Sequence, residues 1–276
     1  MNSLYKEAGL SKQAVVQYHA RQKLFDNKVG QMILEADELR EDHPGCGVEK
    51  MYYTLKPDFM GRDRFITLMM GLGYRLKRKK NHRRTTVASN TNYPNLIKGM
   101  KVDRPSVIWQ SDITYIPVDN RHYYAVFIMD VYTKKIVGYK VSDNMRAKAN
   151  VDALNMALKA NDAPLIHHSD RGSQYTYKGY TELLKRNGSR VSMALSAQDN
   201  AYAERINRTI KEEYLDHWKP ENFGQLKKMM KKAVNNYNTK RLHNNNQRMS
   251  PEKFIDQFSL LRPQQRKSMT IFDNEN

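Results

Sequence analysis

Three acidic residues that lie far apart in the sequence have the chemistry to form one metal site. Asp112 lies in the alternating segment VIWQSDITYIPV, Asp170 follows the segment PLIHHS, and Glu204 lies in the first turns of a helical segment. Carboxylates within a few ångströms of one another repel and raise each other's pKa unless a cation neutralises them. Because hard oxygen ligands suit Mg²⁺ or Mn²⁺ and disfavour zinc, convergence of these residues predicts a site for one of those ions.

Such a site would act on phosphodiesters. Two divalent ions about 3.5–4 Å apart activate the attacking oxygen and stabilise the leaving oxygen of an in-line displacement. The hypothesis is that Asp112, Asp170 and Glu204 are the catalytic residues and the ligands of two Mg²⁺ or Mn²⁺ ions. Structural roles are the alternatives: an ordinary strand residue for Asp112, a turn residue for Asp170, and a solvated glutamate paired with Arg208 for Glu204.

Two other acids compete for these roles. Asp130 is the alternative to Asp112, but it lies on the next predicted strand. Asp199 is the alternative to Glu204, and its place just before the helix fits an N-cap better. His168, two residues before Asp170, either supports that carboxylate or is a strand histidine satisfied by the backbone.

The composition points to a polyanionic partner. The 276 residues include 47 Lys+Arg against 29 Asp+Glu, which gives a net charge of +18 and a pI of about 9.8. This balance favours nucleic acid as the partner. A hydrophobic content of 39% argues against wholesale disorder. The single cysteine, Cys46, excludes an internal disulfide and a Cys-ligated zinc site.

Hydropathy gives no sign of a membrane protein. No segment has the roughly 20 apolar residues of a membrane span. The N-terminus MNSLYKEAGLSKQ lacks the apolar core of a signal peptide. We therefore expect a cytoplasmic protein with no membrane partner.

A change of hydrophobic period divides the chain. Residues 1–85 have helical periodicity and predict a small all-α, helix-turn-helix-like region that binds DNA. Residues 86–104 predict a basic and polar linker, residues 105–260 the catalytic core, and residues 261–276 a basic, disordered tail. Gly9 separates two short helical patterns in the first region, and Ser11 is the expected N-cap of the second.

The second of those patterns, residues 11–20, is the candidate recognition helix. Its side chains available for base edges are Lys12, Gln13 and Gln17. A separate amphipathic stretch follows from Asn27 to Arg40.

The core region predicts alternating strands and helices. The expected strands are residues 107–118, 123–131, 134–142, 164–170 and 190–195, and the expected helices are residues 147–160, 176–188 and a long one from Asp199. Gly188 is the expected glycine just past the end of the second helix. This order predicts an α/β fold, a ribonuclease-H-like mixed five-stranded sheet with flanking helices. In that topology the first and fourth strands are neighbours, so the three acids can converge.

Three sequence blocks also carry a family resemblance. WQSDITYI around Asp112, HHSDRGSQY around Asp170 and QDNAYAERINRTIKEE around Glu204 resemble the catalytic core of the retroviral-integrase superfamily. More narrowly, they resemble transposases of the insertion-sequence-3 family of bacterial mobile elements. The later segment YNTKRLHNNNQRMSPEKF is similar to the end of that family's core, and HPGCGVEKMYYTL resembles its helix-turn-helix-like region. The likeness spans about His43 to Phe254.

The resemblance implies a transposase, a metal-dependent polynucleotidyl transferase that frees the ends of an element and joins them to another strand. Its implied partner is DNA, as the element's terminal inverted repeats and as target DNA, and joining two ends implies a homo-oligomer, at least a dimer. The implied location is the bacterial cytoplasm, in association with the nucleoid. The sequence departs from the family in one loop, because only 33 residues separate Asp170 from Glu204 and a frequent Gly-Asn pair lacks its glycine.

Residues in several parts of the chain, most of them basic, are expected to bind DNA. The run RLKRKKNHRR has seven Lys or Arg and no acid in ten residues. Asn207, Arg208 and Lys211 share the helical face of Glu204 and fit backbone contacts, with a solvated face as the alternative. The basic segment QLKKMMKKAVNNYNTKR adds salt-sensitive affinity. The full set of expected DNA-binding residues is Lys77, Arg78, Lys79, Lys80, Arg83, Arg84, Arg171, Asn207, Arg208, Lys211 and Arg241.

Two other functions stay open at this point. A catalytically decayed relative would keep DNA binding and act as a regulator, and a ribonuclease-H-type or Holliday-junction nuclease would share the metal site. The chain also fits the downstream product of a frameshifted fusion or a truncated copy.

Overall fold

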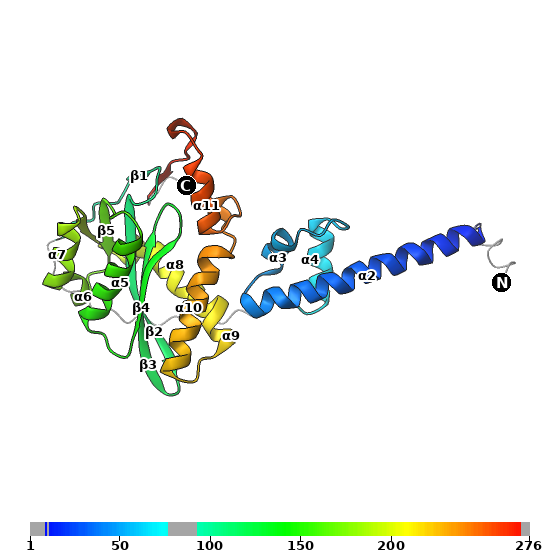
Figure 1. Cartoon of the computed structure of the whole chain (residues 1–276), viewed down its shortest axis with the longest axis horizontal. Helices are drawn as coiled ribbons and strands as arrows, with labels where there is room; N and C mark the ends of the chain where they lie inside the picture. Colours follow the sequence, from blue (N-terminus) through cyan, green and yellow to red (C-terminus); the bar gives the residue numbers. More distant parts are fainter. Residues whose placement is uncertain (1–8, 10, 77–92, 272–276) are drawn as a thin grey trace. The chain divides into compact units, whose positions relative to one another are not determined.

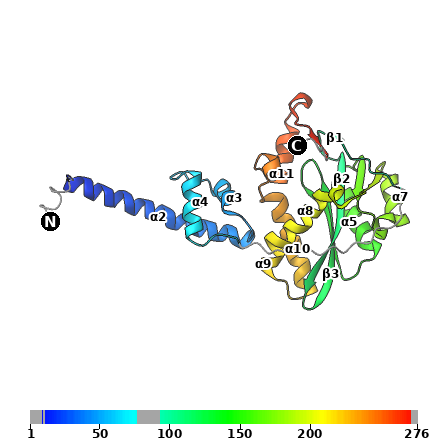
Figure 2. The ribbon, with the colours of Figure 1, turned by 180° about the vertical axis from the view of Figure 1, so that it is seen from behind.

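The structure is a computed structural model that describes residue 9, residues 11–76 and residues 93–271. The chain divides into two units, Met1–Arg78 and Lys79–Asn276, which are drawn in Figures 1 and 2. Among the described residues, no helix combines the length and the apolar character that crossing a bilayer requires.

The first unit is helical, as predicted. It contains α2 (Lys12–Asp42), α3 (Val48–Leu55) and α4 (Arg62–Gly71). Its small core draws Met32 and Ala36 from α2, together with Met51 and Phe65 from the two shorter helices. The α3–α4 hairpin packs as a pair of short helices, whereas the short helical pattern predicted before Gly9 lies outside the described residues.

Helix α2 is longer than the sequence analysis predicts. Ser11 is its N-cap, and its hydroxyl accepts from the Ala14 N–H at 3.0 Å. The helix then continues unbroken for 31 residues, through the two stretches that were predicted as separate helices. No proline interrupts it, and the one internal glycine, Gly30, is tolerated because a single helical glycine costs only about 1 kcal/mol.

The second unit is built on a mixed five-stranded sheet in the order β4-β3-β2-β5-β6. Its strands are β2 (Ile108–Val118), β3 (Arg121–Asp130), β4 (Ile136–Ser142), β5 (Ile166–Ser169) and β6 (Arg190–Met193). The first three form an antiparallel meander, and β5 and β6 run parallel to β2. The predicted pairing of the first and fourth core strands is thus confirmed.

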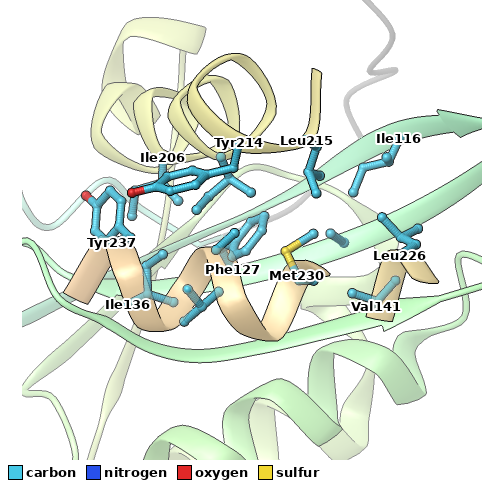
Figure 3. Packing of buried hydrophobic residues seen from close by; sticks show 14 of the residues in the cluster. Ile116, Phe127, Ile136, Val141, Ile206, Tyr214, Leu215, Leu226, Met230 and Tyr237 are labelled. Carbon is cyan, nitrogen blue, oxygen red and sulfur yellow. The ribbon is translucent and has the colours of Figure 1, made fainter. Parts of the chain in front are cut away.

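Helices cover both faces of this sheet, so the unit has three layers (Figures 1 and 2). On one face lie α8 (Ala201–Ile210), η2 (Lys211–Leu215), α9 (Asp216–Trp218) and α10 (Phe223–Thr239); on the other lie α5 (Ala147–Ala160), α6 (Ser173–Thr176) and α7 (Lys178–Arg186). Alternation along β3 sends Phe127 to the first core and Val126 to the second. Figure 3 shows the first core, where Phe127 and Ile136 of the sheet meet Ile206, Tyr214 and Met230.

Two glycines explain how close the helices come to the sheet and where one of them ends. A Cβ on Gly138 in β4 would lie 2.3 Å from the Ala153 carbonyl oxygen, so only glycine lets α5 pack this closely. Gly188 follows the C-cap of α7 with φ +75°, which confirms the predicted helix end.

The start of α8 differs from the prediction. A 3₁₀ turn, η1 (Ala197–Asn200), precedes the helix, and Ser196 is its N-cap. Asp199 is not an N-cap; its carboxylate reaches back and accepts from the Leu195 and Ser196 N–H groups, each at 2.9 Å. These bonds lower the pKa of Asp199. The competing acid therefore has a structural role.

The ends of the second unit pair with each other. Strand β1 (Lys101–Val102) is antiparallel to β7 (Met269–Thr270), and Ile97, Val102 and Ile271 are fully buried in one hydrophobic cluster. The predictions of a linker at 86–104 and of a disordered tail at 261–276 are therefore wrong for residues 97–102 and 263–271. A few apolar residues in each polar segment find partners in the other segment, which is a contact between distant parts of the chain that local composition does not reveal.

The α11 helix (Pro251–Ser259) and η4 (Pro263–Gln265) lead into β7. Phe254 and Phe258 of α11 pack against the cluster around β1 and β7. The second unit therefore continues as packed structure past the predicted core boundary at residue 260.

Candidate active site

The middle strand of the sheet supplies the first acid. Asp112 lies midway along β2, opposite Phe127 of β3 and beyond the end of β5. Its carboxylate accepts from the Ile113 N–H at 2.9 Å and from the Asn207 side-chain amide of α8 at 2.8 Å. The second bond joins the strand to the helix that carries Glu204.

The second acid follows the neighbouring strand. Asp170 comes directly after β5, which pairs with β2 through Ser169 and Ser111. Its Oδ1 accepts from the Gly172 N–H at 3.0 Å, so the turn that leaves the strand holds the carboxylate. The parallel pairing places Asp170 beside Asp112, because each follows directly after a member of the same residue pair.

The third acid lies on the helix that crosses this end of the sheet. Glu204 is exposed in the first turn of α8, and Ala203, Ile206 and Asn207 beside it are buried. This pattern turns the apolar side of α8 towards the sheet, while Glu204 stays at the edge that faces solvent.

The three carboxylates affect one another's ionisation. Burial, together with the charges of Asp170 and Glu204, raises the pKa of Asp112 to about 8 against the two hydrogen bonds that lower it. Burial also raises the pKa of Asp170 and of Glu204, and the charge of Asp170 acts on Glu204 as well. The fold therefore gathers three acids, distant in sequence, into one electrostatic site.

The described residues do not include a ready-made ligand cluster: no three His, Cys, Asp or Glu side chains are already arranged to hold one ion. The three acids interact by charge, but their oxygens are not arranged around a common ion.

Several of the predicted DNA-binding residues surround this site, and one of them has a different role. Asn207 is buried and donates to Asp112, so it holds that carboxylate and does not project towards a ligand. Arg208 is exposed, and its charge lowers the pKa of Glu204 against the effect of burial. Lys211 is half-buried and within charge interaction of Asp112. Arg171 lies between Asp170 and the turn and is partly buried.

The prediction for Arg241 is wrong. Its guanidinium makes a bidentate pair with Glu213, with N–O distances of 2.7 and 2.6 Å, and the two side chains are only 12% and 19% exposed. The arginine also lies over the Tyr237 ring. It therefore fixes the segment after α10 against η2 and is not available to a phosphate.

Other predicted residues lie outside the described part of the chain or have structural roles. Lys77, Arg78, Lys79, Lys80, Arg83 and Arg84 belong to the residues that the structure does not describe. Asp130 is buried at the end of β3 and accepts from the Ser106 and Thr133 N–H groups. His168 is buried, and its Nδ1 hydrogen-bonds to the Ser192 hydroxyl at 2.8 Å.

The polar residues that join β2 to α6 and to the start of α8 beside the acids were not predicted from the sequence. The Ser111 hydroxyl contacts the Tyr175 hydroxyl of α6 at 2.9 Å, Asn200 donates to the Ser111 carbonyl, and Gln110 bonds to the start of α8. Their one signal was the pair of polar residues, Gln110 and Ser111, inside an apolar strand.

Comparison with known proteins agrees with this fold. The integrase core domain family matches residues 102–197, and a second integrase core domain family matches residues 190–251. A 31 kDa protein of insertion element IS600 from Shigella sonnei is 34% identical over 208 residues, covering 72% of this chain and 76% of that protein. The transposase of IS904 from Lactococcus lactis is 34% identical over 194 residues, covering 67% and 76%.

A solved structure supports the fold. The intasome of simian T-cell lymphotropic virus in complex with the PP2A regulatory subunit B56 gamma aligns with a TM-score of 0.50 at 15% identity, over 79% of this chain and 73% of that chain. The ribonuclease-H-like architecture predicted from the strand order is confirmed. With its integrase core and its insertion-sequence relatives, the chain belongs to the insertion-sequence-3 family of bacterial transposases.

Proposed function

We propose that Asp112, Asp170 and Glu204 are the catalytic acids of this DNA transposase and the ligands of its divalent metal, Mg²⁺ or Mn²⁺. The observation that carries the proposal is the crowding of three carboxylates at one end of the sheet, where burial and like charge raise the pKa of Asp112 to about 8. Like charges gathered in this way are costly unless a cation balances them.

The donor set fits a hard divalent cation. All three side chains offer carboxylate oxygens, and none of the three is held by an arginine or lysine ion pair among the described residues. Two such ions would supply Lewis-acid activation of the attacking oxygen and charge stabilisation at the leaving oxygen of a phosphodiester.

The chain's own residues prepare this site. Asn207 orients the Asp112 carboxylate by donating to Oδ2, and the Gly172 N–H orients Asp170. Arg208 is exposed next to Glu204, and Lys211 lies beside Asp112, so both can meet phosphates of a strand that enters between the acids. The proposed products are a freed 3′ end of the element and its joined form on another strand.

The acid substitutions test this assignment. Asp112→Asn, Asp170→Asn and Glu204→Gln should each lower Mg²⁺-dependent cleavage and joining on the order of 10³-fold, because each removes a charge that stabilises the metal and the transition state. Binding to a DNA end should change little. The measurement is single-turnover cleavage of labelled DNA, with filter binding alongside.

Asp152→Asn is the matched control, because Asp152 of α5 pairs with Lys140 at 2.9 Å on the opposite face of the sheet. It should cleave at the wild-type rate. Full activity in any of the three site variants would overturn the assignment. Inactivity of the wild-type chain on every DNA end, with retained binding, would instead support the regulator.

Helix α10 is the second part of the proposed DNA surface. Lys227, Lys228 and Lys231 are exposed, and the helix contains no acid. Lysines at i and i+4 repel each other, which weakens the helix by a few tenths of a kcal/mol per pair unless an anion lies between them. A DNA backbone along this face would supply that anion.

Neutralising two of these lysines tests the surface. Lys228→Gln with Lys231→Gln should weaken DNA binding and flatten the plot of log affinity against log salt by about 0.9 for each phosphate that is no longer neutralised. The control is Lys178→Gln with Lys185→Gln on α7, which removes the same charge from a helix where Lys178 pairs with Glu182. Equal slopes for both double variants would exclude α10 as a DNA surface.

The remaining parts of the proposal follow from joining two DNA ends. The proposed substrates are the element's terminal inverted repeats and a target duplex. The proposed assembly is a dimer or a larger oligomer, and the proposed location is the cytoplasm, at the nucleoid. Sedimentation of the chain on paired end DNA tests the assembly, and a monomer on synapsed ends would contradict it.

A further inference from the structure

Buried hydrogen bonds join the start of α8 to strand β2 beside the proposed site. The side chain of Gln110, which is fully buried, donates from Nε2 to the Asp199 carbonyl oxygen at 3.3 Å and accepts at Oε1 from the Ala203 N–H at 3.4 Å. Asn200, also buried, donates from Nδ2 to the Ser111 carbonyl oxygen at 3.1 Å. These contacts end one residue before Asp112 on the strand and one residue before Glu204 on the helix.

A side chain of β2 accepts a hydrogen bond from the first turn of α8. The first N–H groups of a helix have no partner within it and usually bond to the N-cap side chain. Asn200 is the N-cap of α8, but its Oδ1 accepts no cap bond, while its Nδ2 donates to β2. Gln110 supplies the missing acceptor at Ala203 instead.

This arrangement fixes the helix along the strand. Apolar packing of Ala203 and Ile206 holds α8 against the sheet but resists sliding only weakly, since the hydrophobic effect is non-directional. Hydrogen bonds from two different positions of β2 define where the first turn lies. Gln110 is fully buried, where an apolar side chain would usually lie. A buried amide is costly unless both its N–H₂ group and its oxygen are hydrogen-bonded.

We infer that Gln110 and Asn200 are positioning residues that fix the first turn of α8, which carries Glu204, to the part of β2 that carries Asp112. The inference rests on the proposed function, because it takes these two acids as metal ligands. Neither residue is a ligand itself; each acts through the backbone that carries one. Supporting hydrogen bonds of this kind change metal affinity or activity by about 10- to 100-fold in other metal sites.

The molecule offers a matched control for the effect of a buried amide on stability alone. Asn238 of α10 is buried and bonds to the Ile136 N–H and carbonyl of β4, both at 2.9 Å. It also joins a helix to a strand of the same sheet through both ends of an amide, but neither element carries a proposed ligand.

The experiment uses the full chain and three variants: Gln110→Met, which keeps the length of the side chain and removes both bonds, Asn200→Ser, which can still cap but cannot reach β2, and Asn238→Leu. Mn²⁺ binding is followed by electron paramagnetic resonance of the free ion, and Mg²⁺-dependent cleavage, DNA affinity and thermal unfolding are measured on the same samples. Asn200→Ser removes a single bond and keeps the test decisive if Gln110→Met does not fold.

Gln110→Met should raise the Mn²⁺ dissociation constant and the Mg²⁺ concentration for half-maximal cleavage by about 10- to 100-fold, and Asn200→Ser by a smaller factor in the same direction. DNA affinity should stay within about twofold. Asn238→Leu should lower the unfolding temperature as much as Gln110→Met and leave both metal readouts within about twofold of wild type.

Wild-type metal binding in both Gln110→Met and Asn200→Ser would overturn the inference, as would an equal loss of metal binding in Asn238→Leu. The proposed function fails separately, since in that case Asp112→Asn itself would bind Mn²⁺ and cleave like the wild type.

Discussion

Asp112 and Asp130 are two aspartates on adjacent strands of one sheet, and their surroundings are opposite. Asp130 accepts from the Ser106 N–H at 2.6 Å and from the Thr133 N–H and hydroxyl at 2.7 and 2.8 Å, and the Lys134 charge lies nearby. Asp112 accepts two hydrogen bonds and faces two other acids.

Burial raises the pKa of both carboxyls, but the other contributions differ in sign. Around Asp130 the donors and the lysine all favour the charged form. Around Asp112 the charges of Asp170 and Glu204 oppose it. A buried acid whose neighbours donate hydrogen bonds to it and carry positive charge has a structural role. A buried acid whose neighbours are also negative indicates a cation-binding site, and therefore a functional one.

The sharpest difference should appear in stability. Asp130→Asn replaces an acceptor oxygen with an N–H₂ group that faces backbone donors, which should lower the free energy of unfolding by about 3 kcal/mol. For a unit of this size the unfolding temperature should fall by roughly 6–12 °C. Calorimetry measures this change, with Asp162→Asn on the exposed loop after α5 as the neutral control. An unchanged transition would break the comparison.

Metal should act on one aspartate and not on the other. At a Mg²⁺ concentration of 100 times its dissociation constant, the wild type should gain about 2.7 kcal/mol of stability. Asp130→Asn is less stable than the wild type without metal, but Mg²⁺ should stabilise it by the same amount. Asp112→Asn should lose most of the stabilisation by Mg²⁺. Thermal unfolding with and without MgCl₂ gives the three values, and a full gain in Asp112→Asn would place the metal elsewhere.

The smallest effect is expected for Asp112→Asn without metal. The single amide oxygen can accept only one of the two bonds, from Asn207 or from the Ile113 N–H, but this loss is offset because the neutral side chain does not repel Asp170 and Glu204. The free energy of unfolding in urea at pH 7 should therefore stay within about 1 kcal/mol of the wild-type value. Functional sites often lower the stability of a protein, so replacing a residue there can cost little. A loss as large as that of Asp130→Asn would contradict the difference drawn between them.

Much of the fold follows from local pattern. Alternation in 107–118 and the apolar run from Tyr123 predicted β2 and β3 within a few residues, and helix 147–160 agrees with α5 to the residue. These elements could be predicted because their burial has a single period and their ends carry clear signals such as Gly188.

The errors concern contacts between distant segments. Nothing local shows that Ile271 packs beneath β1, or that Arg241 meets Glu213 and not a phosphate. The acids could be proposed because their residue types restrict the chemistry. The amides of Gln110 and Asn200 could not, since a polar side chain in a strand has many uses until its partner is known.

The pairing of Lys101 with Thr270 has an evolutionary consequence. It brings together β1, labelled in Figure 1, and β7, which are the first and last strands described in the second unit. A folded unit whose first and last strands are adjacent can be inserted into another polypeptide, or joined to a further recognition domain, without rearrangement of its core.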